Sequence, residues 1–227
     1  MALVCVGIAF AGFVSRYFAP VAAGSFTAPA LVHMHGFAMW TWTVVFAWQT
    51  WLAANGRLRW HRTYGMAGIA LFTLAVWLGA SVAVQQLDRQ LDAGRGDTAR
   101  AFLAMPISLT FMMTVLFTAA IVNARRPDMH ARLMLLTALV SLTPALARLT
   151  GDVMGTGAHP RNPVVGGFLA LALVGIASAR DLRAGARLHP VYLYGGGFVA
   201  LCMLARTTLN RTEAWYVVAD GLRTLAH

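Results

Sequence analysis

The stretch PALVHMHGFAMWTWTVVFAWQTWLAA, residues 29–54, contains 26 residues and no formal charge. As an α-helix it would be about 39 Å long, which exceeds the roughly 30 Å hydrocarbon core of a bilayer. The whole chain is 59% hydrophobic and only 11% charged, with a mean hydropathy of +0.64. Because a soluble domain carries about a quarter charged residues, the sequence predicts an all-α, polytopic transmembrane helix bundle.

We expect about seven spans, because nearly charge-free runs recur along the chain. They are predicted at residues 2–20, 29–54, 64–86, 102–124, 130–150, 163–180 and 190–207. The first run is interrupted by Arg16 and has no positive leader, which favours a retained span over a cleaved signal peptide. Residues 1–207 would form the bundle, and residues 208–227 an amphipathic tail along the membrane interface.

The basic residues are concentrated in short loops, and these predict the orientation. The segments NGRLRWHR, NARRPDMHAR and RDLRAGARLH follow the second, fourth and sixth spans, whereas six of the eight carboxylates lie on the other side. Arginine counts on the two sides are equal, so the prediction depends on the density of arginine in these short loops. It places them in the cytoplasm, with the N-terminus inside and the tail outside.

Composition also excludes several classes of function. All 18 cations are arginine, so no lysine can form a retinal Schiff base. The net charge of +10 is scattered over short loops rather than gathered on a nucleic-acid-binding surface. Cys5 and Cys202 fall in apolar runs and indicate small buried side chains. No Asp or Glu lies inside a predicted span, which disfavours ion-coupled transport. We find no convincing internal repeat.

Three histidines stand beside an arginine where an apolar segment begins: His61, His130 and His189. On the predicted topology they occupy the cytoplasmic ends of the third, fifth and seventh spans. They could converge as ligands of a transition metal ion, or two of them could be axial ligands of haem b. Arg62 and Arg132 could then stabilise an anionic group such as a propionate. The alternative is that all three merely anchor helix ends at the interface.

The second span carries a further candidate, His35. With a helical repeat of 3.6 residues it shares one face with Met39, Trp42, Phe46 and Gln49, and this face is expected to point inward. His35 could bind a cofactor, or it could be a core histidine hydrogen-bonded to a carbonyl or a hydroxyl. His33 points elsewhere, so the two histidines cannot address one centre.

The fifth span has a polar face that could line a pathway for a small molecule or lipid, or only satisfy neighbouring helices. Pro144 should loosen this span, and Arg148 is expected to pair with Asp152 one turn on. The residues of the face are His130, Met134, Thr137, Ser141 and Arg148.

Several blocks resemble a group of uncharacterised bacterial multi-pass inner-membrane proteins. The blocks are HMHGFAMWTWTVVFAWQTWLAANGRLRWHRTYGMAG, RRPDMHARLMLL, DLRAGARLHP and TEAWYVVADGL. The resemblance covers most of the chain and directs attention to His35, His61, His130 and His189, without implying an activity. The placement of histidines is also loosely similar to transmembrane b-type cytochromes and to oxidase-maturation membrane proteins. In those cytochromes, however, the paired histidines lie deep within the helices rather than at their ends.

Two functional hypotheses follow. The first is a membrane protein of redox or respiratory-chain function, with a haem or metal site near the cytoplasmic face. The second is a non-enzymatic accessory or assembly subunit of a membrane complex, with no cofactor of its own. The sequence leaves catalysis undecided. Expected partners are the lipid bilayer and a respiratory or other membrane complex, and no nucleic acid.

Overall fold

The computed structural model describes residues 1–155, 162–183 and 187–225. Within these ranges all regular secondary structure is helical, which confirms the predicted all-α class. Two short π-helices, η1 (Val14–Phe18) and η2 (Val191–Gly195), continue directly into α2 and α9. The α-helices are α1 (Ala2–Phe13), α2 (Ala19–Ala22), α3 (Ala30–Ala54), α4 (Leu58–Asp92), α5 (Gly96–Val122), α6 (Pro127–Ser141), α7 (Thr143–Val153), α8 (Asn162–Arg183), α9 (Gly196–Leu209) and α10 (Glu213–Leu225).

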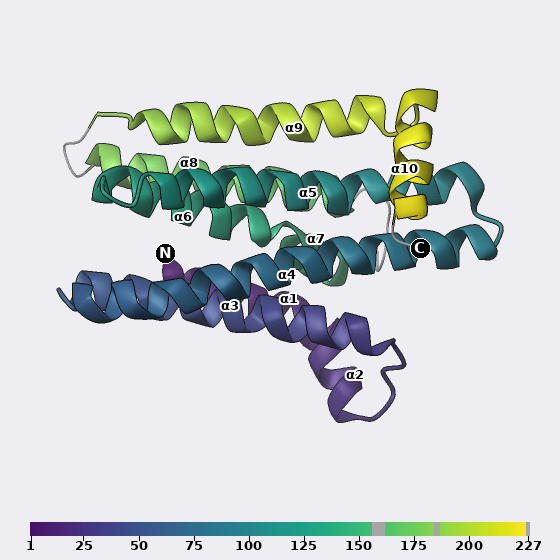
Figure 1. The fold of residues 1–227 in the computed structure, drawn as a ribbon, viewed down its shortest axis with the longest axis horizontal. Helices are drawn as coiled ribbons and strands as arrows, with labels where there is room; N and C mark the ends of the chain where they lie inside the picture. Colours follow the sequence, from purple (N-terminus) through teal and green to yellow (C-terminus); the bar gives the residue numbers. More distant parts are fainter. Residues whose placement is uncertain (156–161, 184–186, 226–227) are drawn as a thin grey trace.

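The long helices run side by side along one axis (Figure 1). Hairpins α3–α4 and α5–α6 pack against each other through α4 and α5, and α7 packs between α1 and α8. Helix α9 lies against α5 and α8, while α10 crosses the end of the bundle against α4 and α5. The helical hairpins therefore bring the short basic loops of the sequence to a common end of the molecule.

Among the described residues, helix length and composition identify four helical segments that could span a membrane. They are Ala2–Ala22, Leu58–Asp92, Gly96–Val122 and Val164–Arg183, and the bent pair α6 and α7 would make a fifth. The chain is therefore compatible with a membrane protein, although these criteria do not reproduce seven spans. Helix α3 is 25 residues long but contains histidine, threonine, glutamine and several tryptophans, which lower its hydropathy.

The fifth predicted span is broken. Helix α6 ends at Ser141, α7 begins at Thr143, and their axes differ by 41°. Pro144 lies in the first turn of α7, where its missing N–H costs little. The loosening predicted at Pro144 is therefore confirmed as a break between two helices.

The interior contains a run of stacked aromatic side chains. Trp42 lies 5.3 Å from Phe72 between ring centroids, and Phe72 stacks on Phe117 at 3.7 Å. Trp42 is also 6.0 Å from Phe46 in a stacked arrangement. Trp42, Phe46 and Gln49 are all buried, which confirms the predicted inward face of the second span.

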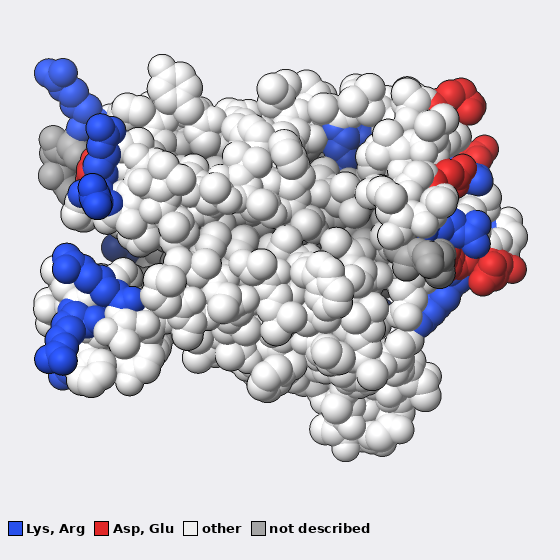
Figure 2. All heavy atoms as spheres, in the orientation of Figure 1, with Lys and Arg blue, Asp and Glu red and all other residues white. Residues whose placement is uncertain are grey.

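The two ends of the bundle differ in charge, as Figure 2 shows. We call the end with the α3–α4 and α5–α6 turns the arginine end. It carries nine arginines, and its two carboxylates, Asp128 and Asp181, are both paired. At the opposite, mixed end, Arg16, Arg100 and Arg223 each form an ion pair with an aspartate. Because six of the eight carboxylates lie away from the arginine end, this end carries the larger net positive charge.

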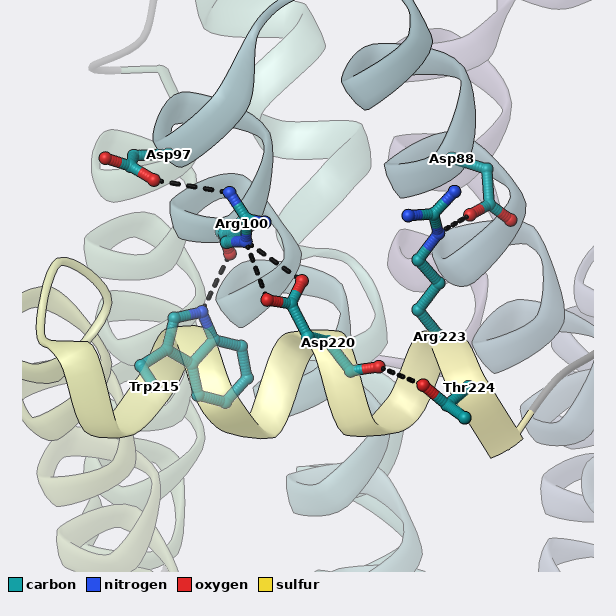
Figure 3. A network of polar contacts seen from close by, with 7 residues as sticks. All are labelled: Asp88, Asp97, Arg100, Trp215, Asp220, Arg223 and Thr224. Carbon is teal, nitrogen blue, oxygen red and sulfur yellow. Dashed lines mark hydrogen bonds and ion pairs between the residues drawn. The ribbon is translucent and has the colours of Figure 1, made fainter.

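Helix α10 is fixed to the mixed end by polar contacts (Figure 3). Arg100 of α5 donates to both carboxylate oxygens of Asp220, and Arg223 donates to Asp88 of α4 at 2.6 Å. The indole N–H of Trp215 donates to the backbone carbonyl of Arg100 at 2.7 Å. The tail predicted from its amphipathic pattern is therefore a helix docked on the α4–α5 hairpin.

Candidate functional site

Two of the three predicted histidines meet at the arginine end. The rings of His61, in the first turn of α4, and His130, in the first turn of α6, have centroids 6.1 Å apart. Their planes are nearly perpendicular, at 86°. The two residues are far apart in sequence but come together because both hairpins turn at this end.

Both imidazoles are held in the same way. The Nδ1 atom of His61 is 3.2 Å from the backbone carbonyl of Gln49, and that of His130 is 2.8 Å from the carbonyl of Ala120. A carbonyl only accepts, so each Nδ1 carries the proton and donates it. The lone pair is then on Nε2, which forms no hydrogen bond within the described part of the chain. Histidine ligands of metals commonly have this arrangement.

The two hairpins use a common local structure to present these histidines. Helices α3 and α5 each end at an asparagine, Asn55 and Asn123, whose side chain donates at 2.8 Å to a carbonyl four residues earlier. A basic turn follows, and the next helix begins with the histidine that bonds back to the preceding helix. Sequence analysis missed this correspondence because the asparagine-to-histidine spacings differ, being six residues in one hairpin and seven in the other.

His189, the third predicted ligand, has other partners. Its Nδ1 accepts the backbone N–H of Val191 at 3.2 Å, so its proton is on Nε2. Nε2 in turn lies 3.2 Å from a carboxylate oxygen of Asp128, in the first turn of α6. With both nitrogens engaged, His189 joins the start of η2 to the start of α6, two residues before His130.

The two predicted arginines also differ from each other. Arg132 is committed to Asp181 of α8, with two nitrogens at 2.7 Å from one carboxylate oxygen, and it donates to the carbonyl of Asp128. Arg62 is exposed and forms no ion pair within the described residues. Of the two, Arg62 has the guanidinium that is available to an anionic group.

His35 is partly buried and hydrogen-bonded to a backbone carbonyl. Its Nδ1 lies 3.2 Å from the carbonyl of Ala75, as the carbonyl-bonded alternative anticipated. A Cβ at Gly79 would lie 2.9 Å from the imidazole, so glycine there makes room for the ring. His33 bonds instead to the hydroxyl of Tyr17 at 3.0 Å, which confirms that the two histidines face different surroundings.

The polar face of the fifth span is largely satisfied by its own helices. The hydroxyl of Thr137 donates to Leu133, that of Ser141 to Ala138, and Arg148 donates to the carbonyl of Pro144. The predicted ion pair of Arg148 with Asp152 is wrong. Asp152 instead bonds Arg16 and Ser15, because the end of α7 packs on the η1 segment, and the Arg148 guanidinium lies over the ring of Phe13 at 4.4 Å.

The described residues contain no group of three or more His, Cys, Asp or Glu side chains placed to hold a metal ion. They do contain one buried carboxamide without a partner: neither Nε2 nor Oε1 of Gln49 forms a hydrogen bond. No protein-family model, curated protein or solved structure matches the chain. The function must therefore be inferred from the geometry of this pair and its surroundings.

Proposed function

We propose that this chain is a seven-span protein of a bacterial inner membrane, oriented with its arginine end toward the cytoplasm. Helix α3 is long enough to cross a bilayer and lies along α4, and η2 with α9 continues as one rod beside α5 and α8. Two of the polar side chains that lower the hydropathy of α3, Thr43 and Gln49, are buried against other helices rather than facing lipid, and η2 lengthens α9. The orientation is supported by the larger net positive charge of the arginine end, which carries nine arginines in short turns and only two carboxylates.

We propose further that His61 and His130 are the axial ligands of a haem. With metal–nitrogen bonds of about 2.0 Å, two imidazoles on opposite sides of one ion have ring centroids roughly 6 Å apart. The observed separation is 6.1 Å, and each Nδ1 is anchored on a carbonyl, so that Nε2 keeps its lone pair. This pair of anchored, perpendicular rings is the observation on which the proposal depends.

The number of ligands favours haem over a bare metal ion. A structural zinc site takes four protein ligands and a catalytic one three, whereas the described residues hold no such group. A porphyrin supplies four nitrogens of its own, so that two axial histidines complete the coordination of iron. Gly65, one turn beyond His61, has no side chain, and outside its own helix only the Gln49 carboxamide lies within 4 Å of where a Cβ would stand, so a ring at this position would meet no side chain from residue 65.

Two axial histidines would leave iron no open position for a substrate. Such a centre carries electrons rather than activating a ligand, and we therefore propose an electron-transfer role in or beside a respiratory chain. Arg62, exposed and next to His61, would neutralise a propionate at the cytoplasmic surface. His189, through Asp128, would hold the start of α6 against η2. Arg132, through Asp181, would hold α6 against α8.

The test is the absorption spectrum of protein purified in detergent from haem-replete cells. We expect a Soret band with one haem per chain, lost in His61→Ala and in His130→Ala. His33→Ala is the matched control, because it removes an imidazole bonded to Tyr17 and should keep the band. Purified wild-type protein without a Soret band would contradict the proposal and favour the accessory-subunit hypothesis, which co-purification of a partner complex would then test.

A further inference from the structure

The Gln49 carboxamide is buried, with the residue 8% exposed, and both of its polar atoms lack partners. No other buried side-chain nitrogen or oxygen in the described part of the chain is in this state. A buried polar group without a hydrogen bond destabilises the folded state, because it has lost its hydrogen bonds to water without replacing them. Gln49 therefore keeps one hydrogen-bond donor group and one acceptor that no side chain or backbone group of the described chain uses.

The space that this carboxamide faces lies beside the histidine pair. The Gln49 backbone carbonyl holds His61, and its side-chain Oε1 is 3.9 Å from where a Cβ of Gly65 would lie. Apart from the local backbone of α4, no other atom of the described chain lies within 4 Å of that point. Gly65 is four residues, or about 6 Å of helix, farther into the bundle than His61. The open space is therefore one turn deeper than the proposed iron ligand.

The surroundings of the carboxamide are aromatic and apolar. On the same face of α3, Phe46 lies one turn from Gln49, and Trp42 stacks on Phe46 with centroids 6.0 Å apart. A shallow groove between α4 and α5 begins one turn beyond Gly65, with Ile69, and continues past Phe72 and Phe117. A ligand suited to this region is flat, conjugated and lipid-soluble, and it carries a polar atom for the carboxamide.

We propose that Gln49 donates a hydrogen bond from Nε2 to a carbonyl oxygen on such a ring, bound against α3 and α4 beside His61. The inference deepens the proposed function and rests on it for the role of the ligand. Two sources share this chemistry: a formyl substituent on the porphyrin, or the carbonyl of a membrane quinone that exchanges electrons with the haem. The carboxamide suits a quinone in both redox states, because it donates to a carbonyl and accepts from the hydroxyl of the quinol.

The proposal makes an unusual prediction for Gln49→Leu, which removes the orphaned polar atoms and nearly keeps the volume. The ligand-free variant should melt about 2–4 °C higher than the wild type, because the cost of burying two unpaired polar atoms disappears. A purely structural role for Gln49 would shift the melting temperature downward. Gly65→Ala should likewise spare the ligand-free fold while filling the space. Gln86→Leu makes the same chemical change at an exposed position and is the control.

The experiment titrates a short-tailed benzoquinone into each variant, following tryptophan fluorescence, and extracts the porphyrin for mass spectrometry. If the source is a quinone, we expect about tenfold weaker binding in Gln49→Leu and in Gly65→Ala, and unchanged binding in Gln86→Leu. If the source is the porphyrin, the extracted porphyrin carries a formyl group. The visible absorption band of the haem-loaded protein then shifts in Gln49→Leu and stays unchanged in Gln86→Leu.

The results separate this inference from the proposed function. The inference would be overturned if the purified protein contained only protohaem and if Gln49→Leu bound quinone as tightly as the wild type. The proposed histidine site would be unaffected by that result. A haem-free protein that still binds quinone through Gln49 would support the inference and contradict the haem proposal. A lower melting temperature in ligand-free Gln49→Leu would also count against the inference.

Discussion

Gly12 of α1 is the position where the close packing of the bundle is most directly testable. A Cβ at residue 12 would lie 2.5 Å from the carbonyl oxygen and 2.7 Å from the Cα of Ala145 in α7. Both of these are backbone atoms, and α7 is confined on its other side by α8, where Gly166 makes a similar approach to Thr143 and Ala147. Gly12→Ala must therefore separate whole helices rather than rotate a side chain.

The cost of this substitution follows from two opposing effects. Overpacking against rigid backbone costs about 3 kcal/mol, the upper part of the usual range. Replacing glycine by alanine inside a helix returns about 1 kcal/mol, so the net loss is about 2 kcal/mol. For a chain of this length that corresponds to a melting temperature lower by roughly 4–8 °C.

The assay is thermal unfolding of detergent-purified protein, followed by circular dichroism, with Gly7→Ala as the matched control. Gly7 lies in the same helix and has no atom within 4 Å of its would-be Cβ. It should gain about 1 kcal/mol from helix propensity and melt slightly higher. The reasoning is refuted if Gly12→Ala melts at or above the wild-type temperature, or if both alanine variants shift equally.

Three further outcomes are expected. Gly79→Ala would push a Cβ to 2.9 Å from the His35 ring and cost about 1–3 kcal/mol, visible as a lower melting temperature with an unchanged Soret band. His189→Ala should lower stability but keep the haem, since this imidazole bonds Asp128 rather than iron; loss of the Soret band would contradict this. Asp220→Asn weakens a half-exposed ion pair worth about 1 kcal/mol or less. Hydrogen exchange should therefore accelerate in α10 alone, and uniform exchange would argue against local docking.

Much of the helical architecture could be predicted because its signals are local. The charge-free run at residues 29–54 predicted a helix that the structure places at Ala30–Ala54. The inward stripe with Trp42 and Phe46 followed from the 3.6-residue repeat. The helix that contains the third predicted span, 64–86, is longer than that span and runs from Leu58 to Asp92, because hydropathy detects the apolar part of a helix and not its polar ends.

The site could be predicted only in part, because it depends on contacts between distant segments. The pattern of His beside Arg selected His61 and His130, but nothing local distinguishes them from His189, whose partners Asp128 and Val191 are set by tertiary packing. The carbonyl bond from each ring to the preceding helix requires the hairpin geometry. Arg148, one turn before Asp152, was predicted as the partner of Asp152 because it is near in sequence. The actual partner, Arg16, lies 136 residues away and is brought there by tertiary packing.

Electron paramagnetic resonance of the oxidised protein tests the central claim most directly. If His61 and His130 are the axial ligands, the iron is low-spin, and the interplanar angle of 86° leaves two of its d orbitals nearly equal in energy. The account predicts one haem per chain with a strongly anisotropic low-spin ferric spectrum, which is lost when either histidine is replaced by alanine. A protein that binds no haem, or a haem whose spectrum is unchanged in both variants, would contradict it.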